Sequence, residues 1–76
     1  MKFGISKLSI VPVRFDANDQ SEMTTQLIFG EHYKILESRA KWSKIEIAHD
    51  KYIGWICNKQ NQEISAEEYQ KLEKEI

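Results

Sequence analysis

The sequence contains little of what covalent frameworks, metal clusters and membrane segments need. It has one cysteine, one proline and three glycines in 76 residues. A single cysteine, Cys57, excludes an intrachain disulfide and a cysteine-based metal framework. No stretch approaches the roughly 20 consecutive apolar residues that span a membrane. These shortages favour a small soluble domain whose fold depends on side-chain packing.

Basic residues are also not concentrated in any one segment. The 11 lysines and arginines are spread along the chain, and the formal net charge is −1. Surfaces that bind nucleic acid or anionic membranes need a dense basic patch. We therefore expect no nucleic-acid partner and no membrane partner, and a nucleic-acid-binding barrel is the least favoured class of function.

The composition that remains is that of a folded domain. Apolar residues make up 41% of the chain and charged residues 30%, and there are two Trp, three Tyr and three Phe residues. Such an aromatic content argues against disorder. A chain of this length forms one domain with a small hydrophobic core.

Several short extended segments alternate with turns. In one of them, Ile45 and Ile47 face one way and Lys44 faces the other, and in another Tyr33 and Ile35 share a face. Short strands separated by turns favour a sandwich or a barrel, and this length favours a single small barrel. The predicted strands are residues 8–13, 23–29, 32–38, 42–48 and 52–57.

The connections carry the usual turn residues. Residues 15–21 form a polar loop of the length that often carries function. Gly30 is expected to supply a positive φ in a turn. Gly54 is expected to allow close packing or a bulge within its strand. Neither glycine indicates a ligand.

The C-terminal tail has a helical pattern. Ser65 and Glu68 fit a capping box, with Ser65 as the N-cap. Tyr69, Leu72 and Ile76 follow at helical spacing. We predict a short amphipathic helix that begins directly after Ser65 and continues to the C-terminus.

Five motifs follow one another over about residues 5–60. They are Val11-Pro12-Val13-Arg14, Ser21-Glu22-Met23-Thr24-Thr25-Gln26-Leu27, Phe29-Gly30-Glu31, Trp42-Ser43-Lys44-Ile45 and Tyr52-Ile53-Gly54-Trp55-Ile56. Their order and spacing resemble the bacterial SH3-like domain family. They are similar in particular to the version that precedes NlpC-type cysteine peptidases of the cell wall.

The resemblance and the strand pattern together predict an all-β fold. We expect a small SH3-like barrel of five or six short strands in residues 1–60. A polar connector and a short C-terminal α-helix are expected to follow in residues 61–76.

The resemblance also implies a function. The related peptidases cleave stem peptides of peptidoglycan next to γ-D-glutamyl residues. The implied role is a non-catalytic accessory domain that helps to bind the free amino end of a murein stem peptide, beside a catalytic peptidase domain. No cofactor and no metal are implied, and a monomer is expected. If Met1 is the native start, the expected location is the cytoplasm, because Lys7, Pro12 and Arg14 interrupt the apolar stretch that a signal peptide needs. Otherwise the expected location is the cell envelope.

The catalytic residues of those peptidases have no counterpart in this sequence. Their nucleophile is a cysteine at the start of a helix, partnered by a histidine much further along. Cys57 instead ends a predicted strand, and His32 and His49 both precede it. Because a Cys–His nucleophile needs an oriented base within hydrogen-bond reach, Cys57 is interpreted as a small apolar residue. Two isolated histidines also do not make a metal site.

Two residues match positions that bind substrate in the related peptidases. There, an acidic residue in the polar loop and a tyrosine before the Gly-Trp pair bind the amino group of a terminal L-alanine. Glu22 and Tyr52 match these two positions, and a carboxylate and a phenol oxygen suit an ammonium group. The alternative is that Glu22 is a solvated loop charge and Tyr52 packs within its strand. If the first interpretation holds, the two should lie near each other at the mouth of the loop.

Arg14 and Trp42 are the remaining candidates for ligand binding. Arg14 can bind a carboxylate through two parallel hydrogen bonds, or it can fix the loop by pairing with Asp16 or Glu22. Trp42 can line a ligand groove or belong to the core.

A rival function uses the aromatic residues. A general protein-interaction module would bind an extended or proline-rich peptide in a groove, formed by Tyr33, Trp42, Tyr52 and Trp55. The alternative for the tryptophans is burial, since a small barrel has few other large residues to fill it.

Overall fold

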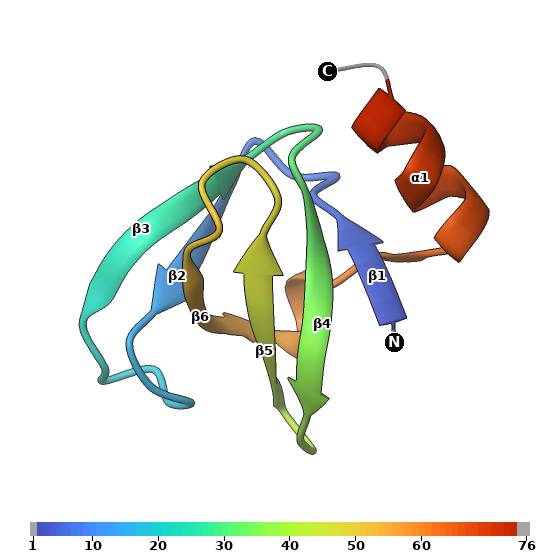
Figure 1. Ribbon diagram of the computed structural model, residues 1–76. Coiled ribbons are helices and arrows are strands. Elements are labelled where there is room, and N and C mark those ends of the chain that lie inside the picture. The colour runs from blue at the N-terminus through green and yellow to red at the C-terminus, as the bar shows by residue number, and fades with distance from the viewer. Residues whose placement is uncertain (1, 75–76) are drawn as a thin grey trace.

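The chain folds into one coiled antiparallel sheet with a helix packed at its side (Figure 1). The computed structural model describes residues 2–74. Within them, the strands lie in the order β3-β2-β6-β5-β4-β1-β7. The elements are β1 (Lys2–Ile5), β2 (Ile10–Arg14), β3 (Met23–Ile28), β4 (His32–Ser38), β5 (Trp42–Ile47), β6 (Ile53–Cys57), the 3-10 helix η1 (Asn58–Gln60), β7 (Glu63–Ile64) and α1 (Ala66–Lys74).

The sheet curls around a single hydrophobic core. The core residues come from β2 and β3 at one end of the strand order and from β4, β5 and β6 further along it. They can meet only because the sheet bends back on itself, as Figure 1 shows. The prediction of an all-β, SH3-like barrel with a C-terminal helix is confirmed. The core cluster consists of Val11, Val13, Leu27, Tyr33, Ile35, Ile45, Ile47 and Ile56.

Alternation along β5 sorts its side chains as predicted. Ile45 and Ile47 are buried inside the barrel, whereas Lys44 and Glu46 are only half-buried on the outer face. Strand β6 follows the same alternation, because residues paired across an antiparallel ladder point to the same face. Lys44 pairs with Trp55, so Trp55 lies on the outer face as well.

Two strands were not expected from the sequence. β1 pairs with β4 and β7 pairs with β1, so the described strands number seven rather than five or six. β1 has four residues and β7 has two, which is too short for a readable alternation. Both form because a distant segment offers a free edge, and β7 does so within the segment predicted as a polar connector.

The turn between β3 and β4 protects the edge of the sheet. Gly30 has a φ of +90°, which confirms the predicted turn glycine. The turn brings the Glu31 side chain back over β3, where its Oε1 accepts a hydrogen bond from the Ile28 amide at 2.9 Å. The last outward-facing amide of this edge strand is therefore occupied.

Helix α1 begins where the capping signal placed it. The Glu68 amide donates to the Ser65 hydroxyl at 3.1 Å, as an N-cap requires. The buried Tyr69 ring stacks on Phe3 of β1 with centroids 4.2 Å apart, so the helix packs directly on the barrel. Ile76 lies outside the described residues. Among residues 2–74, no helix is long and apolar enough to cross a membrane.

Candidate functional site

The polar loop after β2 is closed at its base by hydrogen bonds. The Phe15 amide donates to the Glu22 carbonyl at 2.8 Å, and Arg14 Nη1 donates to the Ser21 carbonyl at 3.0 Å. The Asp16 amide donates to Ser21 Oγ at 2.8 Å. Arg14 thus fixes the loop as predicted, but through a carbonyl group rather than through the carboxylate of Asp16 or Glu22.

Glu22 and Tyr52 flank the end of β2. Glu22 directly precedes β3, Tyr52 directly precedes β6, and β2 lies between these two strands. β6 runs antiparallel to β2 from the pair Arg14–Trp55, so Tyr52 and Glu22 lie toward the same end of β2. Their backbones are separated by two strand spacings, about 10 Å, across the sheet and by two residues, about 7 Å, along the strands. Both side chains are exposed, Tyr52 by 38%.

Within the described residues, the Glu22 carboxylate forms no ion pair and no hydrogen bond. It is therefore free to accept a hydrogen bond from a ligand. The Tyr52 backbone is fixed, because its amide donates to Asp50 Oδ1 at 3.1 Å and its carbonyl accepts from the Ile47 amide at 2.9 Å. The position from which the Tyr52 ring projects is thus set by the turn before β6.

Gly54 allows β6 to approach β2 closely beside Tyr52. A Cβ atom at this position would lie 2.5 Å from Val13 Cγ1 and 3.1 Å from the Arg14 carbonyl oxygen. It would also lie 3.7 Å from Tyr52 Cε1. The expected close packing at Gly54 is confirmed, and it holds the Tyr52 ring next to the end of β2.

The four-residue aromatic groove of the rival function does not form. Tyr33 is fully buried in the core, and its hydroxyl donates to Asn61 Oδ1 at 2.7 Å. The prediction that Tyr33 lines a groove is wrong, because the face that it shares with Ile35 points into the barrel. Burial raises the pKa of Tyr33 to about 12, as expected for a phenol held away from water.

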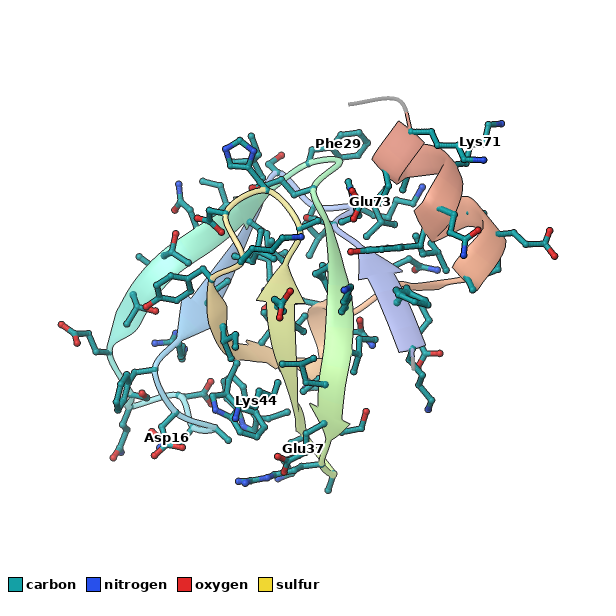
Figure 2. The ribbon with its side chains drawn as sticks, in the orientation of Figure 1. Asp16, Phe29, Glu37, Lys44, Lys71 and Glu73 are labelled. Carbon is teal, nitrogen blue, oxygen red and sulfur yellow. The ribbon has the colours of Figure 1, made fainter. Side chains whose placement is uncertain are left out.

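Trp55 is also buried, but on the outer side of the sheet. It is 7% exposed and is not part of the interior cluster. The guanidinium carbon of Arg39 lies 4.4 Å from its ring centroid, a cation–π contact. Lys44 and Glu37 are cross-strand partners beside it, and Figure 2 shows both near the end of the sheet where Asp16 lies.

Arg14 and Trp42 come together in a shallow pocket of about 230 Å³ on this outer face. Glu22 and Tyr52 are not among its lining residues. The pocket also contains residues that sequence reasoning missed. Register could have found one of them, because Cys57 pairs with Trp42 and so shares its face. The pocket is lined by Pro12, Arg14, Asp19, Trp42, Cys57, Lys59 and Gln60.

A second, larger depression of about 610 Å³ lies between the barrel and α1. Phe29 stands beside the helix there (Figure 2). His32 and His49 both line this depression, whereas Cys57 lines the other pocket. The cysteine and the histidines therefore face different sites. In the part of the chain that the structure describes, no group of three or more acidic, histidine or cysteine side chains could hold a metal ion.

The bacterial dipeptidyl-peptidase Sh3 domain family matches residues 13–60, well over half of the chain. The matched segment runs from the end of β2 through η1 and includes Arg14, Glu22, Trp42 and Tyr52. No curated protein matches the sequence. The chain belongs to the family of bacterial dipeptidyl-peptidase SH3 domains.

Proposed function

We propose that this chain is a non-catalytic accessory domain of a cell-wall peptidase of the NlpC type. In this role it helps to bind the free amino end of a murein stem peptide, beside a catalytic domain. The family match supports the peptidase context. An enzyme that releases dipeptides cleaves its substrate two residues from the amino end, so some part of it must recognise an ammonium group.

Glu22 is the group that suits an ammonium ion best. Its carboxylate is exposed and has no ion-pair partner in residues 2–74, and it lies toward the same end of β2 as Tyr52. A substrate amine between the two would donate hydrogen bonds to the carboxylate and to the phenol oxygen. The proposal rests on this free carboxylate, which lies toward the same end of β2 as the matched tyrosine.

The domain alone should bind such peptides weakly. One exposed ammonium–carboxylate pair contributes about 1 kcal/mol or less, whereas millimolar affinity needs about 4 kcal/mol. The remaining contacts must come from the catalytic domain, which would also exclude water and strengthen the pair. The proposal requires a location where murein peptides occur, above all the cell envelope.

The test compares L-Ala-γ-D-Glu with its N-acetylated form. In an NMR titration of the chain, the free peptide should shift Glu22 and Tyr52 resonances at millimolar or higher concentrations, and the acetylated peptide should not. In a peptidase that carries the domain, Glu22→Gln should lower kcat/KM about threefold to tenfold for free amino ends and spare acetylated substrates.

The matched control is Glu67→Gln, which makes the same substitution at an exposed acidic residue in the first turn of α1. It should leave both substrates unaffected. Equal loss on free and acetylated substrates with Glu22→Gln would mean that Glu22 supports the fold, and the proposal would then be wrong.

A further inference from the structure

The pocket around Trp42 combines an apolar floor with unpaired positive charge. We call it the Trp42 pocket, as defined above by its seven lining residues. Trp42 and Cys57 are cross-strand partners on the outer face of β5 and β6. Pro12 adds a third apolar side chain from β2. The floor thus offers a surface on which an apolar side chain can lie.

Arg14 stands at the side of this floor with most of its donors unused. Its side chain is half-buried, and one nitrogen, Nη1, binds the Ser21 carbonyl. A guanidinium has five N–H donors, and Arg14 forms no ion pair with any Asp or Glu that the structure describes. The loop therefore holds a cation in a fixed position without neutralising it, and a carboxylate is the partner that matches its planar geometry.

The surroundings of the pocket add further positive charge. Lys59 lines it, and Lys41 directly precedes Trp42. The acidic residue in the lining is Asp19. The neighbouring Glu37 is already paired with Arg39, with Oε2 2.8 Å from Nε. The lining thus carries two cations, Arg14 and Lys59, and one acid around an apolar floor, which favours an anionic ligand.

We propose that the Trp42 pocket binds a peptide through a carboxylate and the apolar side chain next to it. The apolar side chain lies on Trp42 and Cys57, and the carboxylate binds Arg14 and Lys59. A volume of about 230 Å³ is below the range of pockets that enclose drug-sized ligands, so it suits one or two residues of an extended segment. The carboxylate can come from an acidic side chain or from a chain end.

This site is separate from the Glu22–Tyr52 site and does not depend on the function proposed above. The two sites require opposite charges on the ligand, an ammonium group at Glu22 and a carboxylate at Arg14. Peptides with an acetylated amino end therefore test the Trp42 pocket alone.

The experiment is an NMR titration of the whole chain with three acetylated peptides. Ac-Ala-Leu-Glu-NH2 carries a side-chain carboxylate, Ac-Ala-Ala-Leu-OH carries a terminal one, and Ac-Ala-Leu-NH2 carries none. At least one charged peptide should shift the Trp42 indole and Arg14 side-chain resonances with millimolar affinity, about fivefold or more tighter than the neutral peptide. The stronger of the two charged peptides identifies the source of the carboxylate.

Variants locate the effect within the pocket. Lys59 is exposed and lies outside the core, so Lys59→Gln should fold normally and weaken the charged peptides about threefold. Arg14→Gln should weaken them further, although it also releases the loop. Lys71→Gln on α1, far from Asp16 and the polar loop in Figure 2, removes the same charge elsewhere and should have no effect.

Any one of four results would overturn the proposal. The first is that the neutral peptide binds as tightly as the charged peptides. The second is that Lys59→Gln and Lys71→Gln weaken binding equally, and the third is that the shifts map to the depression beside α1. Absence of any shift up to tens of millimolar peptide would overturn it as well.

Discussion

The two faces of strand β6 differ in how tightly they are packed. On the inner face, Gly54 and Ile56 leave no room, since even one added carbon at Gly54 would lie 2.5 Å from Val13 Cγ1. On the outer face, Trp55 lies beneath the Arg39 guanidinium, and Cys57 lines an open pocket. The same strand thus sets the shape of the barrel on one side and contributes Cys57 to an open pocket on the other. Changes inside should alter stability, whereas changes outside should alter binding.

The largest expected effect tests the inner face. Gly54→Ala places a methyl group against a buried side chain and the β2 backbone, so it should destabilise the fold by about 3 kcal/mol. Urea denaturation followed by tryptophan fluorescence measures the loss. Ile53→Ala changes the adjacent, half-exposed residue and should cost less than about 1 kcal/mol. Similar losses for both variants would show that β6 is not closely packed against β2.

The second prediction concerns the buried phenol of Tyr33. Its folded-state pKa of about 12 lies above the ordinary value of 10.0. The protonated phenol therefore contributes fully to the free energy of unfolding below pH 10, and this contribution is lost as the pH rises toward 12. A difference of two pKa units between the folded and unfolded states corresponds to about 2–3 kcal/mol in the free energy of unfolding. Denaturant titrations at several pH values between 8 and 12 should show this decline.

Tyr33→Phe is the matched variant for the alkaline decline. It loses the hydrogen bond to Asn61, about 1 kcal/mol at pH 8, and it should lose stability less steeply above pH 10. Burial also raises the pKa of Tyr69 to about 12, so part of the alkaline slope remains in the variant. If the two proteins had the same slope, Tyr33 would not be the responsible group.

The smallest effect is expected on the outer face. Arg39→Gln removes the cation over Trp55 and should cost about 0.5–1 kcal/mol. Glu37→Gln breaks only the exposed ion pair with Arg39, which is worth about 0.5 kcal/mol or less. Denaturation midpoints of the two variants separate these contributions, and equal costs would argue against the cation–π contact.

Local patterns predicted much of the fold. Alternation at Lys44, Ile45 and Ile47 sorted β5 correctly, and Ser65 marked the start of α1. Tyr33 was assigned both to a face shared with Ile35 and to a surface groove, and only the first is compatible with burial of Ile35. The sequence pattern did not predict β1 and β7, because these segments become strands through pairing with distant segments rather than through local propensity.

The candidate sites were predicted less completely. Glu22 and Tyr52 came from family resemblance, because nothing in their local sequence distinguishes them from other loop and strand residues. Arg14 and Trp42 were named individually, but their meeting in one pocket depends on β6 joining β2 to β5. Lys59 could not be found, because the short helix η1 has no periodicity to reveal which side chains face β2.

The hydrogen bond from Ile28 to Glu31 has a consequence for how the protein behaves at high concentration. β3 is an edge strand without a charged residue, and an uncharged edge with free amides invites pairing with strands of other molecules. The Glu31 carboxylate occupies the Ile28 amide and places a negative charge beside it. An incoming strand would have to displace that carboxylate before it could pair with Ile28, which opposes the addition of further strands at this end of the edge.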